Sequence, residues 1–259
     1  MSALTATGSA VLDVGRDIRD ILRMGARTVE LTIRGKKSRR MIFEQAHQIG
    51  NRSVFFIMVT MGFIGMILVF QSALQALQIV PDLSLLVATF GEILIRDLGA
   101  SIGGMMLATR VGAGIAAEIG SMVVTEQVDA LRMCSADPVE YLVVPRFIAS
   151  VVMTFCLLVY AVFVAYVAGM VTANVVFDVN YSTFANFALV DKGDVIVGLT
   201  KCLAYGAAIP IVSAQRGLAT FGGSEGVGWA TTSAVVSSSL AVIVLQFFIS
   251  ALGYVIFPG

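Results

Sequence analysis

Charged side chains are scarce in this chain, and an informative group of them lies in residues 118–146, between two long apolar segments. A bilayer interior penalises charged groups, so this stretch is expected to lie in water. A helix at about 123–133 would carry Val124, Val128 and Leu131 on one side. The pattern favours an amphipathic loop helix that docks a partner outside the membrane, and a solvated connector is the alternative. The charged residues of the stretch include Glu126, Asp129, Arg132, Asp137 and Glu140.

A second group of charges, Arg96 and Asp97, lies inside an apolar segment. Ionisable residues within a membrane span are functional candidates by default. Adjacent residues of a helix do not share a face, so each is expected to meet a different partner. Two uses remain open. One is contact with a zwitterionic or anionic headgroup, and the other is a structural ion pair with another span, for which Lys201 is a candidate.

Three glutamines, Gln71, Gln75 and Gln78, follow one another at spacings of four and three residues. This spacing places their amides on one helical face. Amides are costly against lipid tails, so this face is expected to meet a partner or a cavity.

The sequence contains few residues in patterns that would indicate an enzyme. The glycine-rich segment 216–228 lacks the GxxxxGK[ST] pattern of a phosphate-binding loop, so the chain is not expected to hydrolyse ATP by itself. The single histidine, His47, precedes the first span, which leaves no base beside a serine nucleophile in the membrane. The three cysteines occur singly, without metal-binding spacing. We expect no catalytic residue, no metal site and no nucleic-acid partner.

The elements that must position these residues follow from composition. The 259 residues are 58% hydrophobic and 13% charged, with a mean hydropathy of +0.90, whereas soluble domains hold about 45–50% apolar and about 25% charged residues. These values predict an all-α integral membrane protein with a single domain over 1–259, its membrane part at 54–259. A helix needs about 20 apolar residues to cross a bilayer. Five spans are predicted, at about 54–77, 83–117, 147–177, 195–215 and 229–257.

The N-terminal region is predicted to lie on the membrane surface. Residues 11–34 carry an apolar and a basic face at helical spacing, and a basic turn follows up to residue 40. A helix packed on the protein in water is the alternative. Ten of the 17 Lys and Arg residues lie between Arg16 and Arg52, which by the positive-inside rule places the N-terminus in the cytoplasm. Five crossings then place the C-terminus outside, and no signal peptide is recognisable.

Small residues recur every four positions along the second span. Such a stripe lets two helices approach closely, and a packing seam is favoured over a ligand site. Its members are Ala100, Gly104, Ala108, Gly112, Ala116 and Gly120.

In the segment TEQVDALRMCSADPVEYLVVPR, residues 125–146, the chain resembles the MlaE family of permeases. The resemblance covers about residues 48–252. Its further motifs are GFIGM (62–66), IRDLG (95–99), AEIGSM (117–122) and SSLAV (238–242). Two features depart from the family: the charged pair is more often Arg-Glu, and the outer end of the first span is unusually rich in glutamine.

The resemblance implies the membrane subunit of an ABC transporter that moves phospholipids or related lipids. It implies a homodimer of permeases, two cytosolic ATPases that bind ATP and Mg, and a ring of MCE proteins on the periplasmic side of a bacterial inner membrane. No cofactor is expected in this chain. The loop helix would be the coupling helix, with Glu126, Gln127, Asp129, Leu131 and Arg132. The lipid-contacting residues would be Leu68, Gln71, Gln75, Ile79, Arg96 and Asp97.

Other functions stay open at this point. The chain could anchor an MCE assembly as a scaffold without moving lipid, or it could carry a sterol or another hydrophobic substrate. An importer for a small polar solute is disfavoured, because the spans lack a polar, charge-lined path.

Overall fold

The computed structural model describes residues 3–35, 38–77, 84–184 and 190–257. Within these ranges the regular structure is helical and includes no strand. Five helical segments are long and apolar enough to cross a membrane, and an amphipathic helix precedes them. The predicted all-α membrane architecture is therefore confirmed. The five segments are Arg39–Ala76, Thr89–Val124, Val139–Phe177, Lys192–Leu218 and Gly223–Ile256.

The elements of the described chain follow one another from the N-terminal helix to the fifth span. The N-terminal helix is α1 (Ala3–Arg34), and the first span is α2 (Arg39–Ala76). The second span comprises α3 (Ser84–Ile93), η1 (Leu94–Leu98), α4 (Gly99–Leu107), η2 (Ala108–Gly112) and α5 (Ala113–Val124). The loop helix is α6 (Gln127–Met133). The rest of the chain forms η3 (Val139–Val143), α7 (Val144–Phe177), α8 (Tyr181–Phe184), α9 (Lys192–Leu218) and α10 (Gly223–Ile256).

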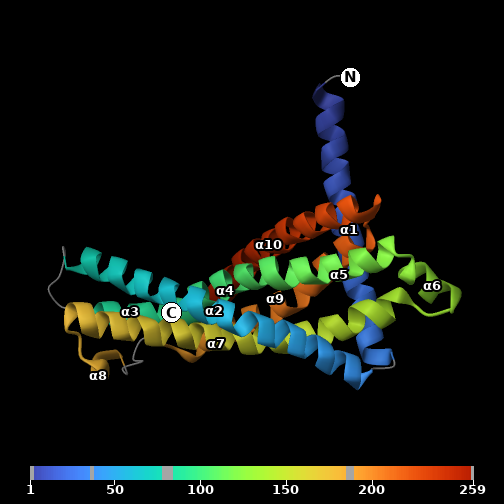
Figure 1. Ribbon diagram of the computed structural model, residues 1–259. Helices are drawn as coiled ribbons and strands as arrows, with labels where there is room; N and C mark the ends of the chain where they lie inside the picture. The colour runs from blue at the N-terminus through green and yellow to red at the C-terminus, as the bar shows by residue number, and fades with distance from the viewer. Residues whose placement is uncertain (1–2, 36–37, 78–83, 185–189, 258–259) are drawn as a thin grey trace.

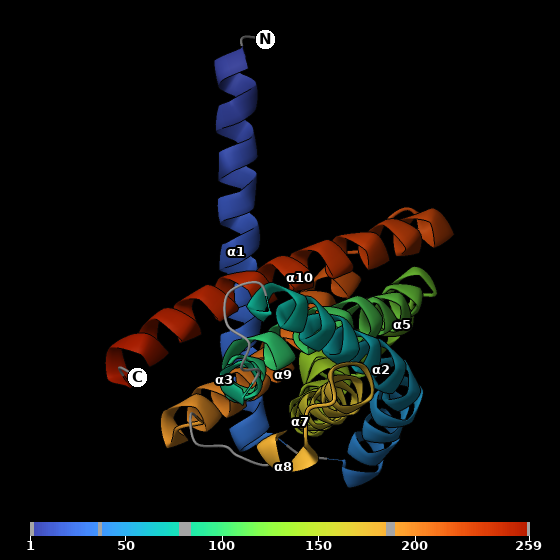
Figure 2. The same cartoon turned by 90° about the vertical axis from the view of Figure 1, so that its left-hand side faces the viewer.

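The long helices form an elongated bundle, with α6 at one end and α8 at the other (Figure 1). We call the end that carries α6 the loop end, and the other the opposite end. The most extensive packing joins α2 to α7, and α9 lies against α7, α10 and α5. α10 runs obliquely across the bundle, whereas α1 runs roughly perpendicular to it (Figure 2).

The helices extend beyond the predicted apolar spans. α2 begins at Arg39 rather than near residue 54, and α5 continues to Val124 rather than ending near 117. Hydropathy marks only the apolar length of a helix, whereas its backbone hydrogen bonds continue into polar sequence. The loop helix is correspondingly shorter than predicted. Residues 123–124 belong to α5, and α6 begins only at Gln127.

Two π-helical turns, η1 and η2, interrupt the second span. A period of four residues drifts by about 40° per step around a regular helix. A π turn takes more residues per revolution, so it reverses part of that drift. The six small residues of the predicted seam are all buried. A Cβ on Gly104 would lie 2.7 Å from Tyr205, and one on Gly112 would lie 2.9 Å from Ser213, so the stripe packs closely on α9.

The N-terminal helix α1 is fastened to the loop end by two ion pairs. Asp17 lies 2.8 Å from Arg216 of α9, and Arg27 lies 2.8 Å from Asp137 of the loop. The N-terminal part of α1 extends beyond the other helices (Figure 1). One side of α1 is therefore held by protein, while an apolar side stays uncovered, as a helix on a leaflet requires. The exposed apolar residues are Ile18, Leu22, Val29 and Ile33.

Candidate functional site

The loop between the second and third spans presents α6 at its surface. Val128 is only 3% exposed and holds the helix on the body of the protein. Asp129 and Arg132 form an exposed ion pair of 3.0 Å. Such pairs contribute little to stability, so both charges remain available to a partner. Of the predicted coupling residues, Leu131 is half-buried, and the exposed ones are Glu126, Gln127, Asp129 and Arg132.

Left-handed backbone conformations mark both ends of α6. Glu126 has φ 60° and Ser135 has φ 57°. Residues with a Cβ adopt this region uncommonly, and such strain is concentrated at functional sites. Glu126 precedes the helix without a side-chain capping bond, and its side chain is exposed. The chain therefore turns sharply before α6 and leaves this carboxylate at the surface.

An apolar groove of about 300 Å³ lies beside α6. Its walls come from the end of α5, from α6 and from η3. A groove of this kind, next to the charges of α6, suits an apolar side chain of a docked protein. Its lining residues are Met122, Gln127, Ala130, Leu131, Cys134, Tyr141 and Leu142.

The two ends of the loop are joined by an ion pair. Arg146 Nη2 lies 3.0 Å from Glu118 Oε2, and Arg146 Nη1 donates to the carbonyl of Leu142 at 2.8 Å. Arg146 is only 4% exposed, so its charge depends on Glu118 for compensation. The pair fastens the start of α7 to α5. A displacement of α6 would therefore be passed to both spans.

Away from the loop, the Arg96-Asp97 pair lies in η1, and each charge meets a different residue of α9. Arg96 Nη1 is 2.8 Å from Asp194 Oδ1. Lys201 Nζ donates to Asp97 Oδ1, and to the carbonyl of Arg96 at 2.8 Å. The structural ion pair with Lys201, one of the two uses considered from the sequence, is thus present. Lys201 is fully buried, whereas 37% of the Asp97 side chain is exposed.

Two residues of α10 extend these contacts into a charged cluster of six. Asp97 Oδ1 also accepts from Gln246 Nε2 at 3.0 Å and from Ser250 Oγ at 2.8 Å. The cluster therefore joins the second, fourth and fifth spans. It comprises Arg96, Asp97, Asp194, Lys201, Gln246 and Ser250.

Sequence reasoning missed three members of the charged cluster, namely Asp194, Gln246 and Ser250. Asp194 had a local signal, because it forms a capping box with Asp191 at the start of α9. That signal predicts the helix start but not the pairing with Arg96, which lies 98 residues earlier.

The glutamine face of α2 lies apart from the charged cluster. Gln71 and Gln75 are exposed, and Leu68 is half-buried against the core. Gln71 borders an open groove of about 450 Å³ between α2 and α7. Among the described residues, no hydrogen bond or ion pair connects Gln71 or Gln75 to the cluster. Gln78 and Ile79 lie outside the described residues.

Known proteins are similar in sequence to this chain over most of its length. The sequence model of the family described as Permease MlaE matches residues 42–252. A probable ABC transporter permease protein of Synechocystis sp. is 37% identical over 224 residues, covering 84% of this chain and 83% of the relative. One from Rickettsia bellii is 37% identical over 214 residues, covering 82% of each. The Arabidopsis thaliana protein TRIGALACTOSYLDIACYLGLYCEROL 1, chloroplastic, is 31% identical over 229 residues, covering 85% of this chain and 63% of the relative. The chain therefore belongs to the MlaE family of ABC transporter permeases.

Proposed function

We propose that this chain is the membrane subunit of an ATP-driven lipid transporter. Membership of the permease family implies an ATPase partner. The proposal adds phospholipid or a related lipid as cargo, a second identical permease, a ring of MCE proteins and a bacterial inner membrane. A relative that carries the name of a galactolipid supports a lipid cargo.

The observation that carries the proposal is the exposed helix α6, in a loop whose two ends are joined by the ion pair between Glu118 and Arg146. In the proposed cycle, two cytosolic ATPases hold ATP and Mg and bind the loop end. Nucleotide binding favours one arrangement of these ATPases, and the permease follows because α6 is bound to them. The ion pair between Glu118 and Arg146 passes the motion to α5 and α7. This orientation places the N-terminus in the cytoplasm and the C-terminus in the periplasm.

The proposed lipid cavity lies between the first and fifth spans of two copies, towards the opposite end. Phe247, Leu252 and Val255 of α10 are 69%, 59% and 79% exposed, so this helix presents an apolar face to lipid or to a second copy. Asp97 would approach the headgroup, because it alone of the Asp97–Lys201 pair is exposed. The proposed lipid-contacting residues are Leu68, Gln71, Gln75, Ile79, Arg96 and Asp97.

The loop assignment predicts that Glu126→Lys uncouples the transporter. Reversing an exposed charge at a docking surface repels the complementary charge of the partner. We expect lipid-stimulated ATP hydrolysis of the reconstituted complex to fall by about tenfold, equivalent to about 1.4 kcal/mol. Membrane insertion should stay normal, because the Glu126 side chain is exposed and makes no capping bond.

Glu225→Lys is the matched control, because Glu225 is also exposed and lies in the first turn of α10, the fifth span. It should leave stimulated hydrolysis within about twofold of the parent. Normal coupling in Glu126→Lys would refute the assignment of α6 as the coupling helix.

Lipid cargo is tested separately, by mass spectrometry of the complex purified with its ATPase and MCE partners. We expect phospholipid to co-purify above the detergent background. An assembled complex without lipid would instead favour the scaffold function, as would full function in a complex whose ATPase cannot hydrolyse ATP.

A further inference from the structure

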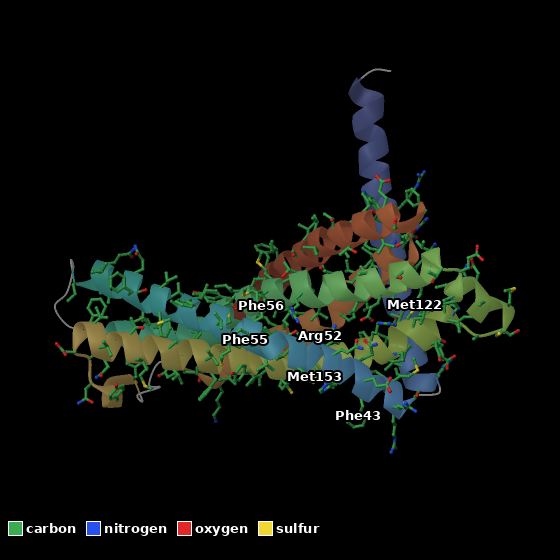
Figure 3. The ribbon with its side chains drawn as sticks, viewed as in Figure 1. Phe43, Arg52, Phe55, Phe56, Met122 and Met153 are labelled. Carbon is green, nitrogen blue, oxygen red and sulfur yellow. The ribbon has the colours of Figure 1, made fainter. Side chains whose placement is uncertain are left out.

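A polar groove lies between α2 and the second span, near the loop end. It has a volume of about 210 Å³. α2 packs on α7 and contacts α4 but diverges from α5, and the groove occupies this divergence. Figure 3 shows Arg52 on α2 beside this gap. The polar residues that line the groove are Gln45, Gln48, Arg52, Ser53, Arg110 and Glu118.

Arg110 is the unusual residue of this groove, because it lies within η2 in the middle of the second span. A guanidinium at such a place is costly without a partner. Its Nε donates to the buried hydroxyl of Ser53 at 3.2 Å. This bond uses only Nε of Arg110. The two terminal nitrogens of its guanidinium form a fork that matches the oxygens of a phosphate.

The groove carries an excess of positive charge. Among the described residues, neither Arg52 nor Arg110 forms an ion pair. The carboxylate that borders the groove, Glu118, is already paired with Arg146 at 3.0 Å. Two positive charges therefore remain for an anion from outside the chain.

An apolar strip continues from Arg52 along the same face of α2. Phe56, Val59 and Phe63 follow at intervals of four, three and four residues, which keeps them on one side of the helix. They are 36%, 37% and 59% exposed. The strip from Arg52 to Phe63 is about 16 Å long at 1.5 Å per residue. This length matches one leaflet, which is about half of the ~30 Å hydrocarbon core.

We propose that this groove binds the phosphate of a membrane lipid from the leaflet at the loop end. Arg52 and Arg110 hold the phosphate, and an acyl chain lies along Phe56, Val59 and Phe63. Free phosphate would leave the apolar strip unused, so a lipid explains both features. The site lies in the loop-end half of α2, away from Gln71 and Gln75. It requires only this chain in a membrane and does not require that the bound lipid is the cargo.

The test uses the purified full chain in non-ionic detergent micelles that contain phosphatidylglycerol with a photoreactive acyl chain. After irradiation, labelled peptides are mapped by mass spectrometry. We expect labelling at residues 56–63, reduced by about tenfold in Arg52→Gln, because a charge-assisted contact to phosphate is lost. Arg52 is exposed and forms no ion pair with the described residues, so this variant should fold normally.

Two further variants separate recognition from net charge. Arg39→Gln removes the same charge from the same helix, about 20 Å away along its axis, and should not change the labelling. Arg110→Lys keeps the charge but loses the guanidinium fork, and should reduce labelling severalfold.

Competition and a neutral probe decide the nature of the ligand. Diacylglycerol with the same photoreactive chain should label residues 56–63 weakly, and excess inorganic phosphate should displace phosphatidylglycerol only slightly. Equal labelling by diacylglycerol, complete displacement by inorganic phosphate, or unchanged labelling in Arg52→Gln would overturn the proposal. Crosslinks from residues 56–63 to a second copy in place of lipid would also overturn it. No ATPase is present, so the outcome is independent of the coupling test.

Discussion

Replacing Asp97 with asparagine is expected to lower the free energy of unfolding by about 3 kcal/mol, because it leaves the buried Lys201 ammonium without a counter-charge. Lys201 is fully enclosed, and its other hydrogen bond goes to the carbonyl of Arg96. The buried lysine must then either keep an uncompensated charge or lose its proton, and both cost free energy. Thermal unfolding of the purified chain in detergent, followed by the fluorescence of the single tryptophan, Trp229, measures the loss.

Removing Lys201 instead of Asp97 should lower the free energy of unfolding by less, and this difference tests the explanation. In Lys201→Met, Asp97 keeps the donors Gln246 and Ser250 and remains 37% exposed, so we expect a loss of about 1 kcal/mol. The double variant should be more stable than Asp97→Asn alone, because no unpaired charge is then buried. An equal loss in both single variants, or a double variant that shows simple additivity, would contradict this account.

Gly65→Ala is expected to separate α2 from α7 and to destabilise the bundle by about 3 kcal/mol. A Cβ at this position would overlap the carbonyl oxygen of Ala165 and lie 2.8 Å from its carbonyl carbon. These are backbone atoms, so no side-chain rotation can relieve the overlap. The whole of α7 would have to move, and α2 packs more extensively on α7 than on any other element.

Gly62→Ala is the control on the same helix, three residues earlier. A Cβ there would meet Val164 Cγ1 at 3.7 Å, an ordinary contact. Alanine favours a helix interior over glycine by about 0.5–1 kcal/mol, so this variant should be neutral or slightly stabilising. Parallel thermal unfolding of the two variants gives the comparison. Similar midpoints would show that the close approach at Gly65 is not essential for packing.

The number of spans could be predicted because apolar length alone determines whether a helix can cross a bilayer. Helix ends could not, since α2 starts at Arg39, in a polar sequence that hydropathy does not register. The start of α6 was misplaced for a local reason. Glu126 adopts a left-handed conformation that glycine or asparagine would have signalled and glutamate does not.

The charged cluster shows where sequence reasoning stops. Lys201 could be named as a partner because charges inside a membrane must be compensated. The packing of three spans was needed to identify the other members, Asp194, Gln246 and Ser250. Neutral amides and hydroxyls do not need a compensating charge, so the sequence alone does not indicate their partners. The same rule applies to Arg110, but in the sequence this residue lies between Ala108 and Gly112 of the small-residue stripe, a pattern that indicates helix packing rather than a polar site.

The ion pairs of α1 determine when the loop end can be completed during synthesis. α1 is made first, but Asp137 follows Arg27 by 110 residues, and Arg216 follows Asp17 by 199. At about 5–20 residues per second, the ribosome needs roughly 10–40 s to synthesise the chain between Asp17 and Arg216. Throughout that interval α1 lacks the ion pair that joins it to α9. The nascent chain thus acquires its finished loop-end surface only after four of its five candidate spans have been synthesised.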